Sequence, residues 1–430
     1  MPFGRRWLFM ENVVRFLFVF SICTFCFLLG IAVGVYRLPP FRVLQDAKQA
    51  AESMMEKYSF LFAKHFEEKM HDKYPNLWFA ASEPGSGVIE KQQESADLIL
   101  YSDCSSDASL IDRSGNVIRR WRLPFYEAYP KAAHILDPVP EDQIYWSKAR
   151  VGPKDSLIAM YAGINQSPYG GGIVKVDQDS AIIWAAAINA HHDFKLNGNS
   201  LFVLTHAYEG GRIEDYLTVL DASTGDVRRS ISLREAIMNS PYASLLPREP
   251  KGDYLHTNSI EVVDREWATR CNVGNEGDIV LSHNNLSAVT LLDMKTEEVK
   301  WALLGVSEGA HDPDLLESCR IAFFDNNGGR SNGAAHSRLL AYDFKEHRIE
   351  LLYSDPGNFH SVNRGSQQRL KNGHWLITES TQGTIFEIDN NGTVVWKFIT
   401  PRRTETSVCV VNYAHAYLRA NLPFLNAKAR

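Results

Sequence analysis

A short pattern recurs six times along the 430-residue chain and constrains its fold more than any other feature. Each copy is an apolar strand that ends in aspartate, a short polar turn and a second apolar strand. The copies occupy residues 109–121, 173–184, 217–230, 289–301, 339–352 and 385–398, and their aspartates are Asp112, Asp177, Asp221, Asp293, Asp343 and Asp389. Turn residues between two alternating apolar runs are typical of a β-hairpin. Turn chemistry explains the aspartates, so they give no evidence of a reaction.

The spacing of the hairpins predicts the architecture. The repeated aspartates are about 45–70 residues apart, the size of a four-stranded propeller blade with its loops. A further apolar strand precedes most hairpins, and we expect it to be the inner strand of its blade; these strands are 199–206, 277–283, 320–326 and 374–380. The sequence therefore predicts an all-β, six-bladed β-propeller over 95–430, whose closed ring leaves no exposed sheet edge. Helical patterns return only at 232–240 and 413–421.

The charge balance limits the class of partner. The chain has 45 Lys and Arg against 51 Asp and Glu, a net charge of −6, and 45% of its residues are hydrophobic. This composition is that of an ordinary globular protein and excludes a disordered chain. No nucleic-acid partner is expected, because phosphate contacts supply most of the affinity of such binders and make them basic.

The N-terminal segment has a different composition. Residues 16–36 contain no charged side chain, and a segment of this length can cross a bilayer core of roughly 30 Å as a helix. We expect a single-pass transmembrane anchor there, with a cytoplasmic tail at 1–15 and the propeller on the periplasmic or lumenal side. Flanking charges are nearly balanced, but long domains are exported largely regardless of them. A cleaved signal peptide, cut after the small residues 32–34, is the alternative.

A helical stalk is predicted between the anchor and the propeller, at 41–75. Apolar residues recur there at spacings of three and four: Leu44, Ala47, Ala51, Met54, Tyr58 and Leu61. The stalk either lies on the main domain or pairs two copies of the chain as a short coiled coil, which would make a homodimer. Beyond it, Cys104, Cys271, Cys319 and Cys409 can pair in three ways, and the sequence does not choose among them.

Histidines mark the start of several expected inner strands. His191 and His192 precede one such strand, His256 another and His311 a third. Because the loops entering the inner strands of a propeller meet at one mouth of its channel, we expect these imidazoles to lie together. The corresponding position of a fourth blade has Arg364. Such a group favours an anionic ligand, and imidazole also serves as nucleophile or proton shuttle near neutral pH.

No cofactor is expected. The sequence holds neither a GxxxxGK[ST] loop nor a GxGxxG motif, which disfavours a nucleotide. A metal site at His191, His192 and Asp193 is also disfavoured, because adjacent side chains of a strand point to opposite faces.

Five segments together carry a family resemblance. They are HHDFKLNGN (191–199), DYLHTNSIE (253–261), GDIVLSHNNLSAVTLLDMKTEEVKWALLG (277–305), AHDPDLLESCRIAFFDNNG (310–328) and RGSQQRLKNGHWLITESTQGTIFEIDNNGTVVWKF (364–398). In order and spacing the chain resembles, over about residues 100–400, the bacterial arylsulfotransferases, which are six-bladed propellers that act outside the cytoplasm. The resemblance implies transfer of a sulfuryl group from an aryl sulfate ester to a phenolic acceptor, without phosphoadenosine phosphosulfate.

The resemblance also implies roles for named residues. His311 corresponds by motif to a histidine that carries the sulfuryl group transiently. His256 matches a supporting acid, base or charge-stabilising histidine, and the pair His191 and His192 supplies a third. Asn258, in the same HTNS motif as His256, is expected to contact substrate.

Two positions depart from the family pattern. Asn284 stands where the family has an arginine that contacts the sulfuryl oxygens, and Ala310 stands where glutamine usually precedes the nucleophile. A missing charged donor costs a few kcal/mol of transition-state stabilisation. Either Arg364 or His283 compensates, or the chain does not catalyse the transfer efficiently. The alternative function is therefore a non-catalytic propeller that binds a ligand or protein in a membrane assembly.

Overall fold

The computed structural model describes residue 24 and residues 77–91, 97–164, 170–326 and 336–425. The chain divides into two compact units, 1–69 and 70–430. The predicted tail (1–15), anchor (16–36) and stalk (41–75) lie outside the described residues, apart from Thr24 in the anchor. In the part of the chain that is described, no helix has the length and apolar character needed to span a membrane.

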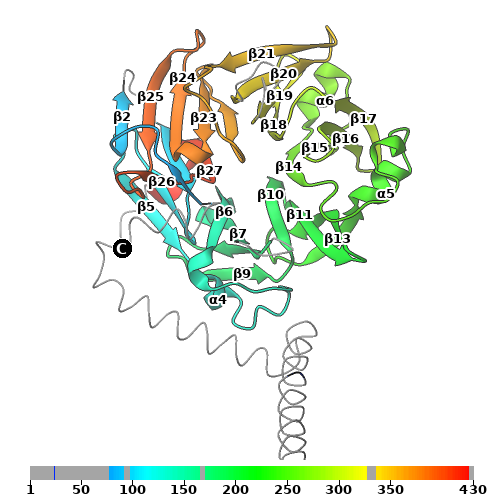
Figure 1. Ribbon diagram of the computed structural model, residues 1–430, viewed down its shortest axis with the longest axis horizontal. Helices are drawn as coiled ribbons and strands as arrows, with labels where there is room; N and C mark the ends of the chain where they lie inside the picture. Colours follow the sequence, from blue (N-terminus) through cyan, green and yellow to red (C-terminus); the bar gives the residue numbers. More distant parts are fainter. Residues whose placement is uncertain (1–23, 25–76, 92–96, 165–169, 327–335, 426–430) are drawn as a thin grey trace, which may run out of the picture. The chain divides into compact units, whose positions relative to one another are not determined.

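Six antiparallel sheets are arranged in a ring (Figure 1), so the predicted six-bladed propeller is confirmed. From the innermost strand outward, blade 1 is β27 (Tyr413–Leu418), β3 (Asp97–Ser102), β4 (Asp107–Ile111) and β5 (Val117–Arg122); blade 2 is β6 (Ile144–Val151), β7 (Leu157–Gly163), β8 (Gly172–Val176) and β9 (Ile182–Ala186); blade 3 is β10 (Ala190–Asn197), β11 (Ser200–Glu209), β12 (Arg212–Asp221) and β13 (Val227–Ser232). Blade 4 is β14 (Thr257–Val262), β15 (Ile279–His283), β16 (Ala288–Asp293) and β17 (Glu298–Leu304); blade 5 is β18 (Ala310–Leu316), β19 (Arg320–Asp325), β20 (Arg338–Asp343) and β21 (Arg348–Ser354); blade 6 is β22 (Ser366–Arg369), β23 (Trp375–Glu379), β24 (Thr384–Ile388), β25 (Val394–Ile399) and β2 (Gly87–Lys91).

The remaining elements are short. Strands β1 (Trp78–Ala80) and β26 (Ser407–Cys409) pair with each other, and the helices are α4 (Phe125–Ala128), α5 (Leu233–Met238) and α6 (Arg265–Cys271). Helix α6 begins where the Asp264 carboxylate accepts a hydrogen bond from the backbone N–H of Trp267 (2.7 Å), which satisfies one of the unpaired donors of its first turn. Helix α5 confirms the helical pattern predicted at 232–240.

All six predicted hairpins are present as the third and fourth strands of a blade, counted from the channel, and their aspartates explain why. In each turn the aspartate side chain accepts hydrogen bonds from backbone N–H groups two to four residues later. Asp112, for example, accepts from Ser114 (2.8 Å) and Asn116 (2.9 Å), and Asp343 accepts from Lys345 (2.8 Å) and Glu346 (3.0 Å). These bonds fix the turn locally, so a short stretch of sequence is enough to specify it.

Two predictions about the inner strands are wrong. The strands expected to line the channel, such as 199–206, are the second strands of their blades. The innermost strands are the segments before them, and three of these, β10, β14 and β18, contain or directly follow the predicted histidines. Innermost strands of neighbouring blades contact one another around the whole ring. They line a polar channel, so they lack the apolar run by which a strand is recognised. The expected helix at 413–421 is β27 followed by a short 3-10 turn, because 413–418 pairs with β3 from the other end of the chain.

The ring is closed by both ends of the propeller sequence. Strand β27 completes blade 1 against β3, and β2 joins the outer edge of blade 6 against β25. A disulfide between Cys104, just after β3, and Cys409, the last residue of β26, lies beside the first of these seams. A second disulfide, Cys271–Cys319, links the end of α6 in blade 4 to the turn between β18 and β19 in blade 5.

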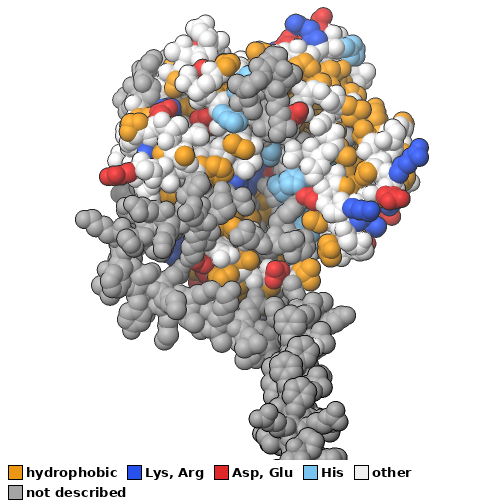
Figure 2. Space-filling view, viewed as in Figure 1, with side chains coloured by type: hydrophobic (Ala, Val, Ile, Leu, Met, Phe, Trp, Pro, Cys, Tyr) orange, Lys and Arg blue, Asp and Glu red, His pale blue; other side chains and the backbone are white. Residues whose placement is uncertain are grey.

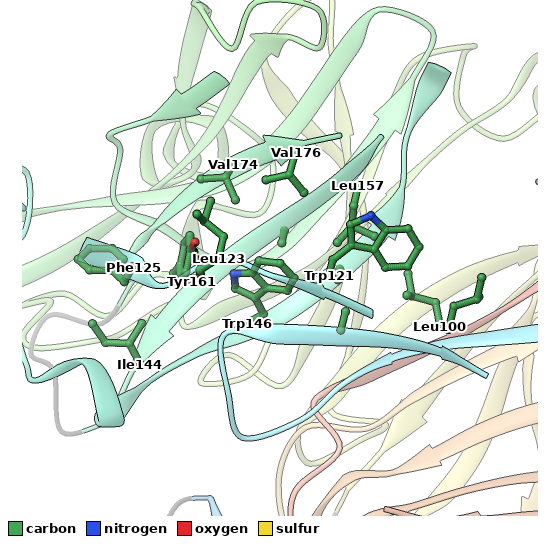
Figure 3. Close-up of a cluster of buried hydrophobic side chains, with 14 of the residues drawn as sticks. Leu100, Trp121, Leu123, Phe125, Ile144, Trp146, Leu157, Tyr161, Val174 and Val176 are labelled. Atoms are coloured by element: carbon green, nitrogen blue, oxygen red, sulfur yellow. Dashed lines mark hydrogen bonds between the residues drawn. The ribbon is translucent and has the colours of Figure 1, made fainter. Parts of the chain in front are cut away.

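Large apolar side chains fill the spaces between blades. Figure 3 shows the cluster in which Leu100 and Trp121 of blade 1 face Trp146, Leu157 and Tyr161 of blade 2, all of them buried. The rings of Trp146 and Tyr161 are 6.1 Å apart in an edge-to-face arrangement, a geometry that aromatic pairs prefer. Packing of this kind fixes each inner strand relative to its neighbours and so sets the geometry of the channel mouth.

Candidate functional site

A cavity of about 460 Å³ lies on the channel, and every blade contributes to its wall. Its lining includes Tyr145, Lys148, His191, His192, Asp193, His256, Asn258, Asn284, His311, Asp312, Arg364 and Tyr413. Histidine side chains gather around the middle of the face shown in Figure 2. A cavity of this volume is large enough for a small aromatic ligand.

The same backbone irregularity occurs at the mouth in four successive blades. Blades 3 to 6 each place a non-glycine residue in the left-handed region there: His192 (φ 55°), His256 (φ 48°), Asp312 (φ 50°) and Arg364 (φ 58°). In blades 3, 4 and 5 the pairing register of the innermost strand shifts at this point, as in a β-bulge. Bulges turn side chains away from the regular alternation and are common beside active sites. They explain how His191 and His192, although adjacent in sequence, both reach the cavity.

His311 has the properties of a neutral nucleophile. Its Nδ1 lies 2.9 Å from the carbonyl oxygen of Gly309, which can only accept a hydrogen bond, so Nδ1 carries the proton. The lone pair of the neutral ring is then on Nε2. Burial lowers the pKa of His311 to about 4, so the ring is neutral at pH 7.

His256 is paired with a carboxylate. Its Nδ1 lies 2.5 Å from Oδ2 of Asp253, and the other oxygen of Asp253 accepts the backbone N–H of His256 at 3.1 Å. Both side chains remain partly exposed at the mouth. The carboxylate accepts a hydrogen bond from Nδ1 and so fixes the orientation of the ring.

His191 and His192 lie in direct contact. Their Nδ1 atoms are 2.8 Å apart, and the rings of His192 and His256 have centroids 4.7 Å apart. Burial lowers the pKa of both His191 and His192 well below the usual value, and the neighbouring imidazoles lower it further. Both rings are therefore neutral at pH 7.

Two cations line the cavity. Arg364 donates to Oδ1 of Asn363 (2.8 Å) and to the hydroxyl of Tyr145 (3.2 Å). Lys148 is paired with Asp193, Nζ to Oδ1 at 2.5 Å, and its ammonium lies 4.2 Å from the ring centroid of Tyr413. Arg364 is the cation that blade 6 presents at the mouth, whereas the charge of Lys148 is largely offset by Asp193.

The structure brings together seven of the eight residues singled out in the sequence. His191, His192, His256, His311, Asn258, Asn284 and Arg364 all line the cavity. Asn258 donates to the carbonyl of Ala310 at 2.9 Å, so it also links blade 4 to the strand that carries His311. His283 is absent from the lining: its two ring nitrogens face the hydroxyls of Thr257 and Thr290, each at 2.9 Å, and it is buried. His283 is therefore not placed to compensate for Asn284.

Sequence reasoning missed Lys148, Tyr145, Tyr413 and Asp253. The signal that would have found the first three is a polar or aromatic residue within an innermost strand, or just before one, once those strands are correctly assigned. Asp253 lies three residues before His256, and a carboxylate at that distance from a candidate histidine deserved to be considered as its partner.

The described residues contain one group whose ligand atoms are close enough to hold a metal ion, Asp103, Cys104 and Cys409. Both sulfurs in that group belong to the disulfide and are not thiolates.

Comparisons with known proteins agree with this architecture. A solved structure of a protein of unknown function from Bacteroides caccae is similar, with a TM-score of 0.50 and 10% identity over 75% of this chain and 99% of that one. Hydrazine synthase from Kuenenia stuttgartiensis is similar at 12% identity, with a TM-score of 0.45, over 75% of this chain and 88% of that one. At such identity the likeness to the Bacteroides caccae structure shows the fold alone. No curated protein matches the sequence.

The family comparison is more specific. The model of the arylsulfotransferase (ASST) family matches residues 153–401, which is more than half of the chain. That range runs from blade 2 through blade 6 and includes every histidine of the cavity as well as Arg364. The chain belongs to the arylsulfotransferase family.

Proposed function

We propose that the chain transfers a sulfuryl group from an aryl sulfate ester to a phenolic acceptor, with His311 carrying the group between the two. The observation that carries the proposal is the state of His311: a neutral ring, held through Nδ1 by the Gly309 carbonyl, in a cavity that also contains His192, His256 and Arg364. An imidazole fixed in this way has its nucleophilic lone pair on Nε2.

The reaction has two half-reactions. In the first, Nε2 of His311 attacks the sulfur, the bond from sulfur to the aryl oxygen breaks, and its electron pair leaves with the phenolate. In the second, the oxygen of the acceptor phenol attacks the sulfur and the S–N bond breaks, returning its electron pair to Nε2. The leaving phenolate gains one proton and the acceptor loses one, so a group beside His311 must supply and then remove a proton.

Charge stabilisation is assigned to Arg364 and His256. Arg364 presents a guanidinium to the cavity, and Asp253 orients the ring of His256. Fixed donors aimed at the sulfuryl oxygens and the departing phenolate act most strongly in a site that excludes water. Arg364 thus takes the part of the arginine that Asn284 replaces.

An exported, membrane-anchored location is part of the proposal. The charge-free segment 16–36 is long enough to span a bilayer, and the propeller holds two disulfides. Disulfides persist in oxidising compartments and are rare in the cytosol.

The experiment is to incubate the purified full chain with 4-nitrophenyl sulfate and phenol and to follow release of 4-nitrophenol and formation of phenyl sulfate. Without acceptor, mass spectrometry should find one sulfuryl group on His311. His311→Ala should abolish both signals, whereas His347→Ala, at an exposed hairpin turn of blade 5, should keep them. Activity that survives His311→Ala refutes the assignment of the nucleophile.

A second function is favoured by one observation. Asn284 lines the cavity at the position of the family's arginine, so the sulfuryl subsite lacks one cation. A propeller of this kind would bind an aromatic or anionic ligand, or a protein, without turning it over. Saturable binding of an aryl sulfate to the chain, with neither turnover nor a sulfated histidine, would favour this function over catalysis.

A further inference from the structure

A line of three titratable side chains runs from the cavity into the interior of blade 3. His192 lines the cavity, His191 lies behind it with the two Nδ1 atoms 2.8 Å apart, and Asp215 of β12 lies behind His191, with Oδ1 3.6 Å from its Nε2. Asp215 is 0% exposed and His191 is 1% exposed. A carboxyl group buried this deeply behind a cavity histidine is costly unless it has a partner or a proton.

The short contact between the two imidazoles restricts their protonation. Of the two facing Nδ1 atoms, one must donate and the other accept. If His192 donates, its lone pair is on Nε2, ready to exchange a proton with a molecule in the cavity. His191 then accepts through Nδ1 and carries its own proton on Nε2, the nitrogen that faces Asp215. The line therefore has the order of a proton relay that ends in a carboxyl group. Its inner step, 3.6 Å from Nε2 of His191 to Oδ1 of Asp215, is longer than a hydrogen bond and must shorten for a proton to pass.

The groups around Asp215 hold its side chain in place, and its burial disfavours the ionised form of its carboxyl group. Its Oδ2 accepts the backbone N–H of Thr257 at 2.8 Å, which ties β12 to the first residue of β14. His206 lies opposite it across β11 and β12, and the ring of His206 is 5.2 Å from that of His191. Burial raises the pKa of Asp215 to about 7; Asp253 also raises it, while Thr257 and His256 lower it. Asp215 can thus hold or release a proton near neutral pH.

We propose that Asp215 and His191 are positioning residues that store a proton for His192, which exchanges it with the leaving and the accepting phenol. The proposal rests on the sulfuryl transfer proposed above. It assigns to the chain a residue, Asp215, that lies outside the cavity and that no motif singled out.

The proton count closes over the two half-reactions. In the resting relay Asp215 holds the extra proton on the oxygen that faces Nε2 of His191, His191 donates through its Nδ1 to His192, and Nε2 of His192 carries a proton, so all three groups are neutral. As the donor's S–O bond breaks, Nε2 of His192 gives its proton to the phenolate oxygen. The Nδ1 proton of His191 then moves to Nδ1 of His192 and the proton of Asp215 moves to Nε2 of His191, which leaves Asp215 as a carboxylate. As the acceptor attacks, Nε2 of His192 takes the phenol's proton and the relay returns to its first state. No oxidant, reductant or further reactant is needed.

The test compares donors whose phenols differ in basicity. Phenolate is a strong base and needs a proton as it leaves, whereas 4-nitrophenolate is a weak base and leaves without one. Asp215→Asn keeps an oxygen for the Thr257 N–H but cannot carry the proton. We expect this variant to lose about 10²-fold or more in kcat/KM with phenyl sulfate and little with 4-nitrophenyl sulfate, because general-acid assistance is worth about 10²–10⁴-fold. The dependence of rate on leaving-group basicity should therefore become steeper.

The matched control is Asp103→Asn. Asp103 is also buried, burial also raises its pKa to about 7, and it pairs with Arg402 (Oδ2 to Nε, 3.0 Å) outside the cavity lining. Its replacement should change the rates with both donors by the same factor. If Asp215→Asn fails to fold, as judged by circular dichroism, His191→Gln breaks the same line one step nearer the cavity and should show the same selective loss.

An equal loss with both donors in the folded variant would overturn the relay and leave Asp215 with a purely structural role. A wild-type chain that transfers sulfuryl from neither donor refutes the proposed function itself. The two failures are therefore distinguished within one set of measurements.

Discussion

The disulfide that lies beside the ring seam should stabilise the propeller more than the other one. Cys104–Cys409 joins residues 305 apart in sequence, whereas Cys271–Cys319 joins residues 48 apart. In other respects the pairs are well matched. Each has one fully buried sulfur, Cys409 at 0% and Cys319 at 1% exposure, and one half-buried partner. The packing cost of replacing each pair by serine should therefore be similar, and the length of the closed loop should decide the difference.

The magnitude follows from chain entropy. In the chain-entropy model, a cross-link lowers the entropy of the unfolded state by an amount that grows as 1.5R times the logarithm of the number of residues in the closed loop. For separations of 305 and 48 residues the stabilisation at 25 °C is about 6 and about 4 kcal/mol, before native strain and residual structure reduce both figures. The difference between the two stabilisations, about 1.6 kcal/mol, depends only on the ratio of the two loop lengths.

The assay is urea unfolding of the two double-serine variants beside the wild type, followed by tryptophan fluorescence. Trp121 and Trp146 are buried between blades 1 and 2, next to the seam, so they report on its opening. We expect the Cys104→Ser/Cys409→Ser variant to unfold at the lower urea concentration. An equal or larger loss in Cys271→Ser/Cys319→Ser would refute the reasoning, since it would show that local contacts, rather than closure of the ring, set the contribution of each bridge.

Two further predictions concern the cavity. Because burial lowers the pKa of His311 to about 4, kcat/KM with 4-nitrophenyl sulfate should stay level from about pH 8 to about pH 5 and fall only as the ring becomes protonated below that. The 4-nitrophenol released at each pH is measured after the reaction is stopped with alkali. A decline in kcat/KM centred near the ordinary histidine pKa of about 6.5 would contradict the prediction. Arg364→Met should lower kcat/KM by about 10²–10³-fold, the usual effect of removing one oxyanion donor. Asn284→Arg should restore part of the loss in that background, and no recovery would mean that position 284 does not face the sulfuryl group.

The hairpins could be predicted from the sequence because their chemistry is local. An aspartate that accepts the N–H groups two to four residues later fixes a turn without help from the rest of the chain. Six such turns at blade-sized intervals were enough to give the number of blades. The anchor at 16–36 and the stalk at 41–75 stay predictions, since they lie outside the described residues apart from Thr24.

The strands that build the site were not predictable by the same means. Strand β27 takes its conformation from pairing with β3, which lies more than 300 residues earlier, and nothing in its own sequence records that partner. The innermost strands line a polar channel, so their alternation lacks the apolar residues that mark a strand. His311 and His256 were found through motifs, whereas Lys148 had no such signal and Asp215 contacts the site only through tertiary structure.

The left-handed residues at the channel mouth connect the repeat to the chemistry. Holding a non-glycine residue in that conformation costs roughly 1–3 kcal/mol, yet blades 3 to 6 each do so at the same place, with His192, His256, Asp312 and Arg364. Elsewhere the left-handed conformation is adopted by Gly383 and Asn272 at helix ends, and by Glu297 and His347 in exposed hairpin turns. The strain is explained if each bulge serves to aim a side chain that glycine cannot supply. The repeated blade thus provides four equivalent positions around one cavity. Two of them carry an imidazole, one a carboxyl group and one a guanidinium, and these side chains give the cavity its titratable and cationic groups.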